Sequence, residues 1–214
     1  MRRDRPIVCL ITDRRRLDGA GDPTAAVVEL ARSAAAAGVA LVQIRERDLE
    51  AGRLAVLAAS VAAATRGTPA RIVINDRLDV ALTSGVDGVH LRGDSVPPRD
   101  ARAIAPPGFL IGRSVHSVAE AEEHAPHVDY LIAGPVFPTA SKPAGTRWLG
   151  TDGLRRIAAA VDVPVLAVGG LDVESVPRIA EAGAAGLAAI SLFLTHTASL
   201  AAMMDLLRRR WSEC

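Results

Sequence analysis

Polar side chains around residue 45 carry the clearest chemistry in the sequence. Gln43, Arg45 and Arg47 follow one another at every second position from the end of a predicted strand. Because side chains along a strand alternate between its faces, these three share one face. Two guanidinium groups and an amide there can hold an anionic group by charge-assisted hydrogen bonds. The alternative is that both arginines form surface ion pairs with Glu46 or Asp48.

Another apolar strand ends in a different polar pair, Asn75 and Asp76. A carboxylate beside an amide, across a rim from two arginines, suits a magnesium ion that bridges a diphosphate. The alternative is a helix cap, because aspartate is favoured just before a helix and a helix is predicted from Arg77. The residues alone leave both interpretations open.

Two strand ends near the C-terminus have the composition of a phosphate site. One reads Val168-Gly169-Gly170 and the other Ile190-Ser191. Glycines let backbone N–H groups approach a phosphate, and the N-terminus of a helix adds positive potential. The alternative is a pair of tight turns without a ligand.

The long irregular segment at residues 134–150 carries further polar groups. Thr139, Ser141 and Lys142 offer two hydroxyls and an ammonium, which can close over a pyrophosphate. The alternative is a solvated loop rich in turn-forming residues.

One histidine, His116, follows the predicted strand that ends at Ser114. An imidazole there can transfer a proton near neutral pH. The alternative is a capping or packing role at the helix that begins near Ser117. His90 is expected to be a core residue below the rim. The histidine spacing predicts no zinc site.

These residues need a fold that brings many strand ends to one rim. Short β-branched runs alternate with Ala-rich helical stretches along all 214 residues. Strict alternation predicts parallel strands, and eight repeats predict a closed barrel. We therefore expect a single (β/α)₈ TIM barrel over residues 1–214. The expected strands are 7–12, 41–45, 71–75, 88–91, 110–114, 130–133, 165–168 and 186–190. The expected helices are 23–37, 50–65, 77–83, 98–105, 118–124, 151–160, 173–182 and 199–210.

Composition excludes several classes of protein. With 25 Lys and Arg against 24 Asp and Glu, no overall charge attracts nucleic acid. Two cysteines, Cys9 and Cys214, form neither a disulfide framework nor a metal site. The apolar run after the charged start is too short for a signal sequence or a membrane span. We expect a cytoplasmic protein without nucleic-acid or membrane partners, and the sequence leaves open whether it forms a homo-oligomer.

Taken in order, five segments resemble the superfamily of thiamin phosphate synthase and thiazole tautomerase. The resemblance covers nearly the whole chain, and its specificity comes from the ordered set rather than from any single motif. The segments are residues 42–47 (VQIRER), 74–81 (INDRLDVA), 85–91 (GVDGVHL), 134–139 (GPVFPT) and 167–170 (AVGG).

The resemblance implies a transferase that joins a hydroxymethylpyrimidine diphosphate to a thiazole phosphate and releases pyrophosphate. It also implies these two small phosphorylated substrates and Mg²⁺ as the cofactor. The implied catalytic residues are Arg45, Ser114, His116 and Lys142, and the implied magnesium ligands are Asp76 and Asp94. The implied substrate-binding residues are Gln43, Arg45, Arg47, Asn75, Ser114, Thr139, Ser141, Lys142, Gly170, Ile190 and Ser191.

Two positions depart from the synthase pattern. The family's stretch after the strand-four histidine ends in Gly-Gln-Glu-Asp, whose last residue is a second magnesium ligand. Here residues 92–95 read Arg-Gly-Asp-Ser, so Ser95 is aligned with that ligand and Asp94 is expected to substitute for it. Arg47 stands where lysine is usual.

Residues 111–117 (IGRSVHS) resemble the related tautomerase, which isomerises a thiazole carboxylate phosphate without metal. His116 would then transfer the proton. The retained Gln43, Asp76 and Thr-x-Ser-Lys run favour the synthase. A barrel that binds thiazole phosphate without catalysis is an alternative of another class, because a fold does not determine an activity.

Overall fold

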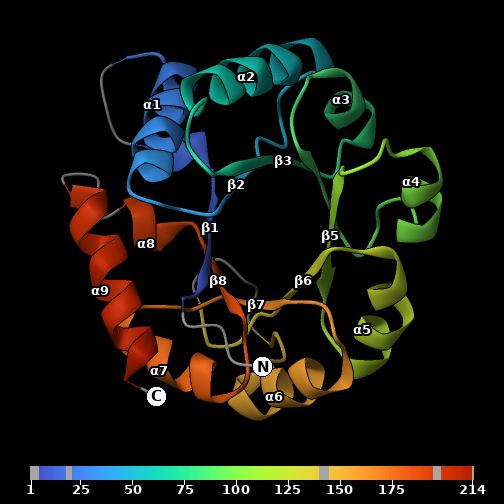
Figure 1. The fold of residues 1–214 in the computed structure, drawn as a ribbon, viewed down its shortest axis with the longest axis vertical. Helices are drawn as coiled ribbons and strands as arrows, with labels where there is room; N and C mark the ends of the chain where they lie inside the picture. Colours follow the sequence, from blue (N-terminus) through green and yellow to red (C-terminus); the bar gives the residue numbers. More distant parts are fainter. Residues whose placement is uncertain (1–4, 18–20, 140–144, 195–198, 214) are drawn as a thin grey trace.

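A closed barrel of parallel strands forms the centre of the molecule (Figure 1). The computed structural model describes residues 5–17, 21–139, 145–194 and 199–213. Within these residues eight strands pair in sequence order, and β8 pairs with β1 to close the barrel. The expected (β/α)₈ architecture is confirmed. The strands are β1 (Ile7–Ile11), β2 (Leu41–Ile44), β3 (Arg71–Asn75), β4 (Gly88–Leu91), β5 (Leu110–Val115), β6 (Tyr130–Ala133), β7 (Val165–Val168) and β8 (Gly186–Ala189).

Helices surround the barrel on its outside (Figure 1). None of those described is long and apolar enough to cross a bilayer. The α-helices are α1 (Pro23–Ala36), α2 (Ala51–Ala64), α3 (Leu78–Thr83), α4 (Pro98–Ile104), α5 (Val118–His124), α6 (Gly150–Ala160), α7 (Val176–Glu181), α8 (Ser191–Leu194) and α9 (Leu200–Ser212). The 3₁₀ turns are η1 (Arg14–Arg16), η2 (Ala125–His127) and η3 (Val173–Ser175).

The helix expected over residues 173–182 is divided in two. Asp172 and Ser175 form a reciprocal capping box that closes η3 as a single turn. Pro177 then lies in the first turn of α7, where its missing N–H does not interrupt a helical hydrogen bond. The short helix α8 after β8 was not expected either, because four residues carry too little periodicity to be detected.

Alternation along the strands separates two apolar layers. On β2, Val42 and Ile44 pack against the helices, whereas Leu41 packs inside the barrel. The inner layer is small and includes Cys9, Ile11 and Leu166. The same alternation turns Gln43 towards the barrel interior, two residues nearer the carboxyl end of the strand than Leu41.

The seam between β8 and β1 depends on a glycine. Gly186 pairs with Ile7 across it. A Cβ atom on Gly186 would lie 1.9 Å from the carbonyl oxygen of Ile7, which belongs to the backbone and has little room to move.

We predict that Gly186→Ala lowers the free energy of unfolding by about 1–3 kcal/mol, because the added methyl forces the closing strands apart. Urea denaturation followed by circular dichroism measures this change. Gly52→Ala is the matched control, since its new methyl meets nothing within 4 Å and lies in α2. The control is expected to keep or slightly raise stability. Equal stability of the wild type and Gly186→Ala would contradict the packing at the seam.

Candidate active site

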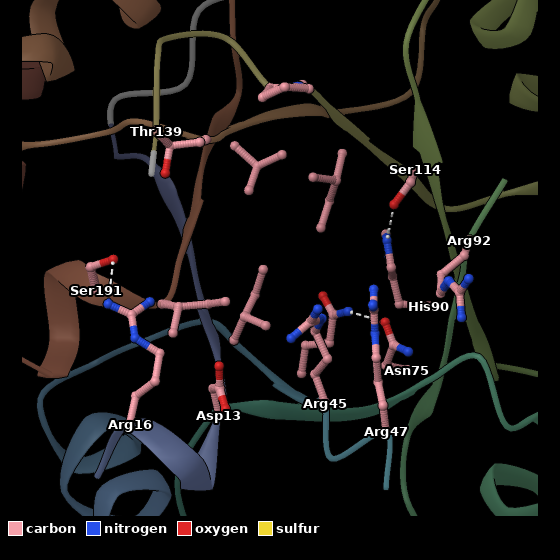
Figure 2. Close-up of a pocket in the computed structure, with 18 of the residues that line it drawn as sticks. Asp13, Arg16, Arg45, Arg47, Asn75, His90, Arg92, Ser114, Thr139 and Ser191 are labelled. Carbon is pink, nitrogen blue, oxygen red and sulfur yellow. Dashed lines mark hydrogen bonds between the residues drawn. The ribbon is translucent and has the colours of Figure 1, made fainter. Parts of the chain in front are cut away.

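A cavity of about 720 Å³ opens at the carboxyl ends of the strands, and every strand end contributes to its lining (Figure 2). Ser141 and Lys142 lie outside the described residues. Gly170, Asp76 and Asp94 are described but do not line this cavity. The residues with an implied catalytic or substrate-binding role that do line it are Gln43, Arg45, Arg47, Asn75, Ser114, His116, Thr139, Ile190 and Ser191.

The two arginines that follow β2 face the cavity (Figure 2). The neighbouring acids pair elsewhere. Arg14 donates from Nη1 to Glu46 Oε2 at 3.2 Å and from Nη2 to Asp48 Oδ2 at 2.5 Å. Within the described part of the chain, no acidic side chain forms an ion pair with Arg45 or Arg47. The alternative, in which Arg45 and Arg47 form surface ion pairs with Glu46 or Asp48, is therefore wrong.

Positive charge is concentrated on this side of the cavity. Arg92, just after β4, lines the same side of the cavity as Arg45 and Arg47 (Figure 2). Burial lowers the pKa of Arg45, and the nearby charges of Arg47 and Arg92 lower it further. Arginine nevertheless stays protonated at neutral pH. A bound anion would relieve this repulsion, so the cluster has the electrostatics of an anion site.

Buried hydrogen bonds order the floor of the cavity. His90 Nε2 lies 2.9 Å from Ser114 Oγ, and its Nδ1 lies 3.3 Å from the hydroxyl of Tyr130. Burial lowers the pKa of His90 to about 3, so the ring is neutral at physiological pH. Gln43 Nε2 donates to Asn75 Oδ1 at 3.0 Å. These contacts fix the polar side chains that line the floor, and they confirm His90 as a core residue.

A second polar cluster lies on the opposite side of the cavity (Figure 2). Arg16 Nη2 donates to Ser191 Oγ at 3.3 Å. Gly169, with a φ of +96°, and Ile190 contribute to the lining here. The sequence did not single out Arg16, which is the last of three consecutive arginines. The single turn η1 decides their directions, because it sends Arg14 to Glu46 and Arg16 to Ser191.

The two carboxylates expected to bind magnesium are joined to one guanidinium. Arg92 Nη1 lies 3.3 Å from Asp76 Oδ2, and its Nη2 lies 2.5 Å from Asp94 Oδ2. The Ser95 hydroxyl donates to the remaining oxygen of Asp76. Asp76 has a φ of +71° and does not cap α3, whose N-cap residue is Arg77. The helix-cap alternative is thus not what the structure has.

Magnesium prefers about six oxygen ligands in an octahedron. Here both oxygens of Asp76 are already engaged, and Asp94 is largely exposed to solvent. Among the residues with described positions, no group of three or more His, Cys, Asp or Glu side chains is arranged to hold a metal ion. As they stand, these donors do not fit a magnesium site.

The imidazole of His116 lies in the cavity lining. Its Nδ1 is 2.5 Å from the carbonyl oxygen of Gly134 and must carry the proton of that hydrogen bond. In the neutral ring Nε2 is then the basic nitrogen. Ser117, not His116, caps α5 through its side chain. His116 therefore lines the cavity and does not cap α5 through its side chain.

Comparison with known proteins identifies relatives of this chain. The family model described as thiamine monophosphate synthase matches residues 8–193. The thiamine-phosphate synthase of Methanoculleus marisnigri is 43% identical over 164 residues, which cover 76% of this chain and 78% of that protein. The corresponding protein of Archaeoglobus fulgidus is 42% identical over 163 residues, which cover 76% and 77%.

A solved structure extends the likeness to three dimensions. The thiamine phosphate pyrophosphorylase from Pyrococcus furiosus superposes with a TM-score of 0.81 at 32% sequence identity. The superposition covers 96% of this chain and 95% of the other. By the family match, the curated relatives and this structure, the chain belongs to the thiamine monophosphate synthase family.

Proposed function

We propose that this protein joins a hydroxymethylpyrimidine diphosphate to a thiazole phosphate and releases pyrophosphate, with thiamin phosphate as the product. The observation that carries the proposal is the presence of two cationic sides in one cavity. Arg45, Arg47 and Arg92 form one side, and Arg16 with Ser191 forms the other (Figure 2). Two separate anion sites suit a reaction between two phosphorylated substrates. The curated relatives named thiamine-phosphate synthase support the same activity.

In this reaction the bond between the pyrimidine methylene carbon and the diphosphate oxygen breaks. The electron pair leaves with pyrophosphate, and the thiazole nitrogen supplies the pair for the new carbon–nitrogen bond. No proton has to move. The protein therefore accelerates the step chiefly by stabilising negative charge as it develops on the leaving group, which is the role we assign to Arg45 and Arg47.

The opposite side of the cavity is assigned to the thiazole phosphate. The Arg16 guanidinium and the Ser191 hydroxyl supply charged and neutral donors, and the glycine turn after β7 leaves room for a phosphate. The fixed barrel strands set the distance between the two substrates, which provides the orientation that a reaction between bound molecules requires. Thr139 faces the same cavity from the segment after β6.

The resemblance also implies a magnesium ion at Asp76 and Asp94, which would neutralise diphosphate charge when bound. It would lie against the guanidinium of Arg92, which pairs with both carboxylates. No step of the proposed reaction passes through the metal. We place the reaction in the cytoplasm, which the free, buried thiol of Cys9 supports.

We predict that two arginine variants weaken the binding of different substrates. Arg45→Met is expected to raise KM for the pyrimidine diphosphate and to lower kcat about 100-fold or more, because the leaving group loses a charged donor. Arg16→Met is expected to raise KM for the thiazole phosphate about 10- to 100-fold. Steady-state kinetics with each substrate varied in turn measures both, and each variant is the control for the other. Equal effects of either variant on both KM values would contradict the two-sided cavity.

His116 favours a second candidate function, the isomerisation of a thiazole carboxylate phosphate. The supporting observation is the basic Nε2 of a cavity-lining imidazole whose Nδ1 is held by Gly134. Proton transfer at carbon needs such a base, whereas the condensation does not.

We predict that His116→Gln keeps condensation activity within about threefold, whereas any isomerase activity falls about 100-fold or more. Pyrophosphate release and thiazole isomerisation are measured in parallel on the wild type and the variant. Rapid isomerisation by the wild type without pyrophosphate release would replace the first function by the second.

A further inference from the structure

We propose that Arg92 takes the place of a divalent cation in this cavity, so that the protein binds a diphosphate through guanidinium groups without metal. The inference rests on the diphosphate side of the proposed function and names its chemistry. It begins with position: Arg92 lines the cavity, whereas Asp76 and Asp94 do not. Asp76 instead lines a smaller pocket of about 90 Å³ that shares Arg47, Asn75 and Arg92 with the cavity, so Arg92 borders both spaces.

The contacts of Arg92 are those expected of a bridging cation. Its two terminal nitrogens reach different carboxylates, with Nη1 at 3.3 Å from Asp76 and Nη2 at 2.5 Å from Asp94. A forked guanidinium can join two carboxylates in this way while part of its surface faces a third anion. The side chain is about one third exposed, so it is accessible from the cavity.

Ser95 completes the arrangement. The backbone N–H of Arg92 donates to Ser95 Oγ at 2.7 Å, and the Ser95 hydroxyl donates a hydrogen bond to Asp76. Both oxygens of Asp76 are therefore occupied by donors. Each oxygen keeps a second lone pair, but a metal ion bound there would lie against the positive charge of Arg92 unless that ion pair broke.

A hydrogen bond from β5 fixes the segment that carries Arg92. Arg113 on β5 is buried, and its Nη2 donates to the carbonyl oxygen of Gly93 at 3.1 Å. Because β5 belongs to the barrel, this bond ties the segment after β4 to the rigid part of the fold. Arg92 is consequently presented beside Arg45 and Arg47 as a fixed third cation.

Three guanidiniums on one side of the cavity match a diphosphate, which carries several negative charges. In many phosphate sites a metal ion supplies part of the positive charge. Here arginine supplies it, with the added specificity of bidentate hydrogen bonds to phosphate oxygens. The substrate class assigned to this side is thus a metal-free diphosphate ester, and the released product is metal-free pyrophosphate.

Isothermal titration with inorganic pyrophosphate tests the proposal without relying on turnover. The wild type is expected to bind with a Kd that differs less than about twofold between EDTA and excess Mg²⁺, once the binding of Mg²⁺ to pyrophosphate in solution is taken into account. Arg92→Met is expected to weaken binding in EDTA about 10- to 100-fold. Arg99→Met is the matched control, because Arg99 is an exposed arginine on α4 that does not line the cavity.

A second variant gives a positive test. Replacing Arg92 by Gly and Ser95 by Asp removes the guanidinium and supplies another carboxylate beside Asp76. This double variant is expected to bind pyrophosphate at least about tenfold more tightly in Mg²⁺ than in EDTA. Its expected gain of metal dependence does not depend on whether Arg92→Met folds well.

Pyrophosphate binding by the wild type that is lost in EDTA and restored by Mg²⁺ would overturn the inference. That result is distinct from failure of the proposed function. Metal-free pyrophosphate binding without any condensation would overturn the function and keep the inference. If both condensation and pyrophosphate binding required Mg²⁺, the proposed function would stand and the inference about Arg92 would fail.

Discussion

Repulsion among guanidinium groups at one mouth of the barrel is the constraint on which the site depends. Arg45, Arg47 and Arg92 lie together there, and burial together with this shared charge lowers the pKa of Arg45. Two acids that adjoin these arginines in the sequence are engaged elsewhere, since Arg14 pairs with Glu46 and Asp48, whereas Asp13 lines the cavity with them. Arg92 is itself paired with Asp76 and Asp94, whereas Arg45 and Arg47 form no ion pair within the described part of the chain, so their charge is available to an anion that enters the cavity.

The barrel turns this local charge into a site for two substrates. Parallel strands that end at one rim place residues from all parts of the chain around a single cavity. The alternation that buries Leu41 also aims Gln43 inwards and continues to Arg45. The contact between Arg16 and Ser191 joins the first strand end to the last and forms the side of the cavity that the proposed function assigns to the thiazole phosphate. A diphosphate leaving group and a phosphate anchor can then occupy opposite sides with their reactive atoms between them.

The sequence predicted the architecture well and the ion pairing poorly. Expected strand limits agree with the structure to within one residue, because short apolar runs between helices leave little freedom. Period-two alternation likewise predicted that Arg45 and Arg47 share a face. The partners of Arg14, Arg16 and Arg92 could not be predicted, since each is chosen by three-dimensional proximity between segments far apart in the chain. The ligand-binding and catalytic roles of the cavity residues and of Gly170 stay predictions, and Asp76 and Asp94 as they stand do not fit magnesium.

A crystal structure of the protein with pyrophosphate and thiazole phosphate tests the central claim most directly. The account predicts one anion in contact with Arg45, Arg47 and Arg92, and the other in contact with Arg16 and Ser191, within the same cavity. Anions bound outside this cavity, or an Arg45 side chain directed away from the bound pyrophosphate, would contradict it.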